Sequence, residues 1–364
     1  MRVLLVEPYL TDSHKAWAEG YREYSAHDVE LMTLPGRNWK WRMHGAAVQL
    51  SSRCASHSKP DVILASDMLD LATFSSLLPS DWRAIPSVLY FHENQLTYPW
   101  PDQDQDRQNG RDLHYAWIHV TGALVAKEIW FNSAFHQRTF LEALRQYLKR
   151  LPGPSLWGRF DEISRKSRVM PIGISPPATN LQADRDPGAI LWNHRWEYDK
   201  NPQGFFQVLE QVKEKGGAFR LIILGPSASE RPPVFERAKR IFEDQIIHMG
   251  YVDDKREYWS WLRKASWAPV TSWHDFLGLS VMESASAGVV PFVPERLSYP
   301  EIFARVPDIF YQKEEDLVSL ILHHLGMQSG LSQQVRQAVS GYHWPVIARR
   351  YDTELEKVCL FDER

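Results

Sequence analysis

Two cations lie close together in the segment ILWNHRWEYDKNPQGFF, residues 190–206. Its apolar start is typical of a strand, and Asn201 and Pro202 are typical of the first positions of a helix. Arg195 and Lys200 are therefore expected between a strand end and a helix start. Unpaired N–H groups at a helix start favour anions, so these two side chains could clamp a diphosphate. A charged surface turn explains the spacing equally well, and the glycine patterns GxxxxGK and GxGxxG are absent.

A second polar cluster is SWHDFLGLSVMESASAG, residues 272–288. We expect a strand that ends near its start, then a loop and an amphipathic helix. Gly278, Leu279 and Ser280 would present backbone N–H groups at the helix start. Asp275 in the loop and Glu283 in the helix are carboxylates suited to accept hydrogen bonds from hydroxyls, such as those of a ribose. Taken alone, Glu283 is more often an ordinary first-turn acid that complements the dipole of a helix start.

Both halves of the chain alternate short apolar runs with helical patterns, as in βαβ units of the α/β class. The expected strands are residues 2–7, 28–34, 61–66, 87–92, 128–132 and 167–172, then 189–194, 219–225, 246–252, 266–272 and 289–294. The expected helices are residues 15–24, 41–56, 67–77, 113–125 and 134–150, then 202–215, 234–242, 256–264, 279–287 and 316–325.

This alternation predicts two Rossmann-like, doubly wound domains that face a cleft, with ligands at the carboxyl ends of the strands. We expect a first domain over residues 1–178 and a second over 188–340, joined by a linker rich in Pro and Gly. Residues 341–364 are expected to form a helix that crosses back to the first domain.

The composition is that of a globular protein of 364 residues with a formal net charge of −3. No apolar run approaches the roughly 18 to 20 residues that span a bilayer. The two cysteines form neither a disulfide framework nor a metal set. The start, MRVLLVEPYL, is interrupted by Glu7 and is expected to be a strand rather than a signal peptide, which favours a cytoplasmic protein.

Two local patches mix basic and aromatic residues. Residues 145–168 hold seven basic and two acidic side chains, which suits a solvated helix face, a nucleic-acid contact or an amphipathic membrane contact. Residues 35–45 combine Trp39, Trp41 and Arg42 with further basic residues. That composition suits base stacking with phosphate binding, and a tryptophan pair that anchors a helix in the core explains it equally well.

Several strings resemble one family across most of the chain. Arg followed five residues later by Lys, and then acid-x-x-Gly-x(4)-Glu, is similar to the sugar-donor site of retaining GT-B glycosyltransferases of family four. SHKAW, LPGRNWKWR, FHENQLTYP, FNSAFH, LWNHRWEYDKNP and HDFLGLSVMESASAG together resemble the tRNA-queuosine α-mannosyltransferase family. The resemblance implies the GT-B fold.

The resemblance also implies roles for single residues. Arg195 and Lys200 would neutralise the diphosphate of a nucleotide sugar, and Glu283 would bind its ribose. Asp275 stands where family four usually carries Glu, near the donor sugar. His92, at a strand end, would contact the sugar or the acceptor as a neutral imidazole, although a lone His there is more often a core or surface residue than a catalytic one. The residues expected on the acceptor side are Ser13, His14, Trp39, Trp41, Arg42, Glu93, Asn94 and Gln95.

The implied function is transfer of mannose, with retention, from GDP-mannose to the cyclopentenediol of queuosine in the anticodon of aspartate tRNA. Neither a metal nor a membrane partner is expected. The segment LGPSASERPP, residues 224–233, is a candidate rim of the base pocket. Two alternatives stay open: a GT-B enzyme with a lipid or small-molecule acceptor, and a non-catalytic protein that binds RNA or a nucleotide sugar.

Overall fold

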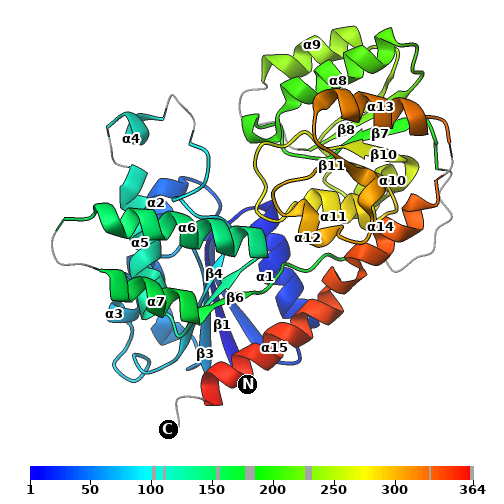
Figure 1. The fold of residues 1–364 in the computed structure, drawn as a ribbon. Helices are drawn as coiled ribbons and strands as arrows, with labels where there is room; N and C mark the ends of the chain where they lie inside the picture. The colour runs from blue at the N-terminus through cyan, green and yellow to red at the C-terminus, as the bar shows by residue number, and fades with distance from the viewer. Residues whose placement is uncertain are drawn as a thin grey trace. The chain divides into compact units, whose positions relative to one another are not determined.

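The chain forms two compact units, each with its own parallel β-sheet (Figure 1). The computed structural model describes residues 1–100, 104–109, 112–152, 156–176, 185–225, 232–327 and 329–360. Unit 1 comprises Met1–Gly173 and Trp344–Arg364, and unit 2 comprises Ile174–His343. The expected linker between residues 178 and 188 falls mostly on residues 177–184, which lie outside the described residues.

Unit 1 has a six-stranded sheet in the order β2-β1-β3-β4-β5-β6, with every neighbouring pair parallel. Its strands are β1 (Arg2–Leu10), β2 (Asp28–Pro35), β3 (Val62–Ser66), β4 (Ser87–Phe91), β5 (Glu128–Phe131) and β6 (Ser167–Val169). Its helices are α1 (Asp12–Tyr24), α2 (Trp39–Ser51), α3 (Leu71–Leu77), α4 (Gln105–Gln108), α5 (Asp112–Val125), α6 (Ala134–Arg150), α7 (Trp157–Lys166) and α15 (Trp344–Leu360).

Unit 2 has a six-stranded parallel sheet in the order β12-β11-β10-β7-β8-β9. Its strands are β7 (Ala189–Trp192), β8 (Arg220–Leu224), β9 (Ile246–Gly250), β10 (Trp267–Pro269), β11 (Val290–Pro294) and β12 (Phe310–Tyr311). Its helices are α8 (Pro202–Glu214), α9 (Pro233–Ile241), α10 (Lys255–Lys264), α11 (Leu279–Ser286), α12 (Tyr299–Ile302), α13 (Glu314–His324) and α14 (Leu331–Val339).

The central strands are buried along their whole length, which explains why they read as continuous apolar runs. Every residue of β3, β4, β7 and β11 is buried. A parallel sheet needs helices on both faces, so both faces of these strands must be apolar. Polar side chains then gather beyond the carboxyl ends of the strands, which is where such sheets bind ligands.

Helix α15 belongs to unit 1 although all of unit 2 precedes it in the sequence. Trp344, at its start, is buried against Gly20 and Gly173, where an added Cβ would lie only 2.2 Å from the indole. Asp352 accepts hydrogen bonds from the Tyr21 hydroxyl (2.9 Å) and from the Ser25 hydroxyl (2.6 Å), and a third from the backbone N–H of residue 26 (2.9 Å). The helix is therefore fixed to the C-terminal end of α1 by a buried carboxylate.

The predicted pair of doubly wound parallel sheets is confirmed, and the expected strands all form. The helix expected over residues 41–56 ends at Ser51, and the one expected from residue 67 starts at Leu71, after Asp70 has capped it. Helices α4, α7, α12 and α14 and strand β12 were not predicted. Across the described part of the chain, no helix combines the length and the apolar character needed to cross a membrane.

Candidate active site

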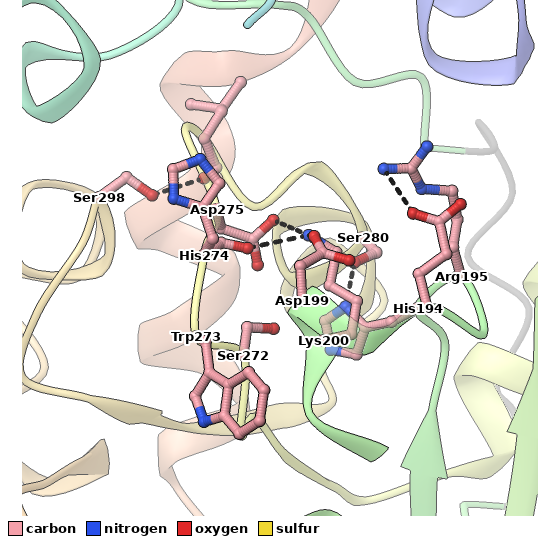
Figure 2. Close-up of polar contacts among 12 residues, drawn as sticks. His194, Arg195, Asp199, Lys200, Ser272, Trp273, His274, Asp275, Ser280 and Ser298 are labelled. Carbon is pink, nitrogen blue, oxygen red and sulfur yellow. Dashed lines mark hydrogen bonds and ion pairs between the residues drawn. The ribbon is translucent and has the colours of Figure 1, made fainter. Parts of the chain in front are cut away.

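The loop after β7 carries both predicted cations of unit 2 (Figure 2). It continues into a 3-10 turn at Tyr198–Lys200 and then into α8. Asn201 has a left-handed backbone with φ of 53°, and its side chain accepts a hydrogen bond of 3.0 Å from the N–H of Gly204. The predicted roles of Asn201 as the N-cap and Pro202 as the first helical residue are confirmed.

Lys200 is buried, and its ammonium group has three oxygen partners. The Nζ atom donates to Oδ1 of Asp275 at 2.8 Å and to the backbone oxygen of His274 at 3.0 Å, and it lies 3.0 Å from the carboxylate of Asp199. Burial lowers the pKa of Lys200, but the charges of Asp275 and Asp199 outweigh that effect and raise it. Because an ammonium has three N–H groups, these partners occupy it fully. Figure 2 shows the Lys200 side chain directed at Asp275.

Arg195 lies on the same loop but at the surface. Its side chain is 52% exposed, and Nη2 lies 3.2 Å from the carboxylate of Glu197. The charge of Arg195 lowers the pKa of Lys200. Of the predicted pair, Arg195 faces solvent and Lys200 supplies a fixed interior charge.

Asp275 accepts hydrogen bonds on both oxygens. Lys200 donates to Oδ1 at 2.8 Å, and the hydroxyl of Tyr299 donates to Oδ2 at 2.6 Å. Burial raises the pKa of Asp275, but the charges of Lys200 and His194 and these two hydrogen bonds lower it to about 2. Burial and the charge of Lys200 lower the pKa of His274 to about 4, so its imidazole is neutral. Tyr299 comes from α12, and the sequence pattern did not point to it.

The start of α11 is tied to the β7 loop by side chains. Ser280 Oγ lies 2.9 Å from Nδ1 of His194, and the amide of Asn193 donates to the backbone oxygen of Ser280 at 2.8 Å. Gly278 precedes the helix with φ of 78°, and an added Cβ would lie 2.9 Å from the ring of Tyr299. Only glycine adopts this backbone beside that ring without strain.

Glu283 lies in α11 and accepts a hydrogen bond of 2.8 Å from the hydroxyl of Tyr258, which comes from α10. Burial raises the pKa of Glu283, although the hydrogen bond from Tyr258 opposes this rise. Leu279 and Ser280 are the first helical residues, so their N–H groups belong to the unpaired set of a helix start. Sequence reasoning missed Tyr258. The candidate rim of the base pocket lies largely outside the described residues, at 226–231.

Unit 1 carries a buried polar group near the carboxyl end of its sheet. Glu7 Oε2 lies 2.8 Å from Nδ1 of His14, and the rings of His14 and His92 have their centroids 4.1 Å apart. The N–H of His92 donates to Asp67 Oδ1 at 2.8 Å. The structure thus brings the predicted residues His14 and His92 together, while Ser13 is exposed. Glu7 and Asp67 were missed, although an acid inside the apolar run RVLLVEPYL was a usable signal.

The residues after His92 form a tight turn. Asn94 Oδ1 accepts hydrogen bonds from the N–H groups of Leu96 (3.1 Å) and Thr97 (3.0 Å). Asn side chains commonly stabilise turns in this way. The amide of Gln95 donates to Glu93 at 3.1 Å. Asn94 therefore shapes the loop that carries its two neighbours.

The two tryptophans of α2 have different surroundings. Trp39 lies against Trp100 and Tyr115, with ring centroids 5.7 Å and 5.2 Å away. Trp41 is 60% exposed and lies over Gly45, where an added Cβ would be 2.7 Å from its ring. The core explanation therefore fits Trp39, whereas Trp41 offers an exposed ring face. Arg42, beside Trp41, donates to backbone and amide oxygens of its own unit at 3.3 Å.

The basic stretch 145–168 is only partly available to a ligand. Lys166 donates to three backbone oxygens at the end of α5, at 2.8 to 3.4 Å. Arg145 and Lys149 lie over the ring of Trp157, at 5.0 Å and 5.4 Å from its centroid. Lys166 thus caps a helix, and the cations on Trp157 form the part suited to a phosphate. Residues 153–155 of the stretch lie outside the described residues.

Glu7, His14 and His92 also present possible metal ligands within 4.8 Å of one another. Ligands around a zinc ion with bonds of about 2.0 to 2.1 Å stand about 3.3 Å apart. The 2.8 Å contact between Glu7 and His14 is instead a hydrogen-bond distance.

Asp-x-Asp spacings, which hold metal ions in other glycosyltransferases, occur at residues 102–106 and 184–186. Asp104 and Asp106 both bind Nζ of Lys40, at 2.8 Å and 2.5 Å. That ammonium takes the place of a metal at these two carboxylates. Asp102 and Asp184 lie outside the described residues.

Comparisons with known proteins match both halves of the chain. Residues 2–174 match the family model "tRNA-queuosine alpha-mannosyltransferase N-terminal", and residues 179–308 match "Glycosyl transferases group 1". A Drosophila melanogaster tRNA-queuosine alpha-mannosyltransferase is 30% identical over 315 residues, which cover 83% of this chain and 82% of that protein.

Solved structures resemble the fold at low identity. The structure described as "Trehalose-6-phosphate from E. coli bound with UDP-2-fluoro glucose" has a TM-score of 0.70 at 12% identity, covering 98% of this chain and 99% of the other. A trehalose-phosphate synthase from Burkholderia xenovorans has a TM-score of 0.68 at 14% identity, with the same coverage. These likenesses show the two-domain GT-B fold, as expected from the sequence. The Drosophila relative and the two family models show that the chain belongs to the tRNA-queuosine α-mannosyltransferase family and is a hexosyltransferase.

Proposed function

We propose that the chain transfers mannose from GDP-mannose, with retention, to the cyclopentenediol of queuosine in the anticodon of aspartate tRNA. The name of the Drosophila relative supports the acceptor and the sugar. The observation that carries the donor side is the buried, fully charged Lys200 between Asp275 and Asp199, with Arg195 on the same loop. A tRNA acceptor implies a cytoplasmic enzyme.

On the donor side, the diphosphate of the nucleotide sugar binds Arg195 and the N–H groups at the start of α11. Lys200 supplies positive charge from the interior of unit 2. On binding, its ammonium group exchanges one of its three oxygen partners for a phosphate oxygen. These groups stabilise the charge that grows on the leaving diphosphate, so they favour the transition state over the ground state. No metal is needed for this step.

The two acids bind hydroxyls of the donor. A carboxylate has about four lone-pair sites, and Asp275 uses one on each oxygen for Lys200 and Tyr299, so further sites can accept from the sugar. Glu283 is held by Tyr258 through Oε2 and binds the ribose through its other oxygen. Asp275 is shorter than the Glu usual at its position, and Tyr299 fixes its orientation.

On the acceptor side, His92, His14 and the loop at residues 93–95 bind the diol, and the leaving phosphate takes the proton of the attacking hydroxyl. Trp41 stacks on a base of the anticodon loop. Arg145 and Lys149 contact the phosphates of the tRNA, which weakens binding at high salt.

The test is incubation with GDP-mannose, or with other labelled nucleotide sugars, and tRNA that contains or lacks queuosine. Mass analysis of the nucleosides is expected to show one added hexose on queuosine, from GDP-mannose only. Transfer to tRNA without queuosine, or an equal rate from another nucleotide sugar, would refute the proposal.

A further inference from the structure

Glu7 is a fully buried carboxylate inside the apolar strand β1. Burying a charged carboxylate is unfavourable unless hydrogen bonds and a cation compensate for it. Oε1 accepts the backbone N–H of Tyr9 at 2.7 Å, and Oε2 lies 2.8 Å from Nδ1 of His14. Both oxygens are therefore held, and one of them is held by a titratable ring.

His14 lies in the first turn of α1 and is 6% exposed. The acids that face it are Glu7 from β1, Asp67 after β3 and Glu93 after β4. Burial lowers the pKa of His14, but the charge and hydrogen bond of Glu7, followed by the charges of the other two acids, raise it to about 9. The ring is thus an imidazolium at neutral pH, and it loses its charge only as the pH rises through about 9. Nε2 has no hydrogen-bond partner within the part of the chain that the structure describes.

The ring of His92 lies against that of His14, but His92 is neutral whereas His14 is charged. The rings are inclined by 30°. Burial and the nearby charges of His14 and His136 lower the pKa of His92 well below its usual value, so it is neutral. Among the residues that the structure describes, its buried Nε2 has no hydrogen-bond partner, and it lies 3.9 Å from Oε2 of Glu7, too far for a hydrogen bond. The cluster therefore joins one charged and one neutral imidazole.

We propose that Glu7 is a positioning residue: by holding Nδ1 of His14, it fixes this ring on His92 and keeps the His14 Nε2–H as a charged donor for a hydroxyl oxygen of the acceptor. The inference deepens the proposed function and rests on it for the identity of the acceptor. A charged N–H binds oxygen more strongly than a neutral one. It also stabilises the negative charge that the attacking oxygen gains as its proton leaves. Because His14 already carries a proton, it acts as a cation rather than as a base.

The first measurement needs no substrate, so its failure is distinct from failure of the proposed function. Histidine resonances are followed by NMR as the pH is varied, and His14→Gln identifies the resonance of His14. We expect a midpoint near 9 in the wild type and, in Glu7→Gln, a shift towards about 6.5, the value of an unperturbed histidine. A wild-type midpoint at or below that ordinary value overturns the proposal, and this result is available even if Glu7→Gln does not fold.

The second measurement is the pH profile of acceptor transfer by Glu7→Gln. With a pKa near 6.5 instead of 9, the protonated fraction of His14 falls about thirtyfold near pH 8 but only slightly near pH 6. We therefore expect a loss of that order near pH 8 and recovery of most of the rate near pH 6. A merely structural defect would not be repaired by acid.

The matched control is Glu30→Gln. Glu30 is a surface acid that lies 2.6 Å from Nδ1 of His57. The substitution therefore removes the same kind of Glu–His pair elsewhere in unit 1. Its pH profile is expected to follow the wild type. A Glu7→Gln profile that is parallel to the wild type at every pH contradicts the proposal.

Discussion

Lys200 combines two tasks in one side chain. It neutralises two carboxylates inside unit 2, and in the proposed reaction it supplies charge to a leaving diphosphate. A buried cation with three oxygen partners is held in place before the substrate arrives, so binding of the diphosphate changes only one of its contacts and little further reorganisation is needed when charge develops. The same arrangement makes the residue important for stability, because removing it leaves two buried acids without their cation.

We predict that Lys200→Ala lowers turnover about a hundredfold or more, which corresponds to a loss of about 2 to 4 kcal/mol of transition-state stabilisation. The free energy of unfolding should also fall, by about 3 kcal/mol, because Asp199 and Asp275 lose their partner. Steady-state rates, measured well below the Tm, give the first effect, and denaturant unfolding gives the second. Lys213→Ala, on the outer surface of α8, is the control for loss of a lysine. A rate near that of the wild type would refute the phosphate clamp.

At the residue scale, the sequence pattern identified the groups that follow strands and helix starts. Arg195, Lys200 and Asp275 were recognised because their spacing relates to one strand and one helix. Tyr258 and Tyr299 were not, because each reaches its carboxylate from a helix that is remote in the sequence. Side chains supplied by tertiary contact leave no local pattern to read.

Helix α11 positions one wall of the candidate site through the residue that precedes it. Gly278 has φ of 78°, and its Cα faces the ring of Tyr299, whose hydroxyl holds Asp275. A change at the helix start therefore reaches the carboxylate through one aromatic ring. The positions of Gly278, the Tyr299 ring and the Asp275 carboxylate therefore depend on one another.

We predict that Gly278→Ala lowers turnover at least about tenfold, because a displaced Tyr299 misplaces Asp275. The left-handed backbone adds a stability cost of about 1 kcal/mol. Gly216→Ala is the matched control: Gly216 has φ of 84°, but no atom of the described residues lies within 4 Å of its added Cβ. It should lose the same stability and keep the wild-type rate. Equal rates in the two variants would show that the Tyr299 contact has no catalytic consequence.

At the element scale, a strand or helix could be predicted from the sequence when it was long enough to show a periodic pattern of apolar residues. The six strands of unit 1 were predicted because each is an apolar run between turn residues. Strand β12 spans only Phe310–Tyr311, which is too short for any period. Helix α14 buries Leu331, Val335 and Val339, and their spacing of four is a helical pattern that the sequence also contains.

Unit 1 is complete only when α15 is in place. Trp344 fills the space over Gly20 and Gly173, and Asp352 binds the end of α1. Two segments that are far apart in sequence thus share one core, and the stability of unit 1 depends on their union.

We predict that Asp352→Ala lowers the free energy of unfolding of unit 1 by about 3 kcal/mol, because Tyr21, Ser25 and one backbone N–H lose a buried acceptor together. Denaturant unfolding, with tryptophan fluorescence as the signal, measures this change. Glu354→Ala removes an exposed ion pair with Lys357 from the same helix and should cost less than about 0.5 kcal/mol. Equal losses in the two variants would mean that the carboxylate does not anchor the helix.

Because unit 1 is formed by two separate segments of the chain, its folding during synthesis has to wait for the second segment. A ribosome finishes the sheet of unit 1, then spends about 10 to 30 s on unit 2 before it releases the tryptophan that closes the first core. Throughout that interval, the surface beside Gly20 and Gly173 that Trp344 covers in the folded protein stays exposed in the nascent chain. We therefore expect a shorter delay in the synthesis of unit 2 to reduce the time for which this apolar surface is exposed.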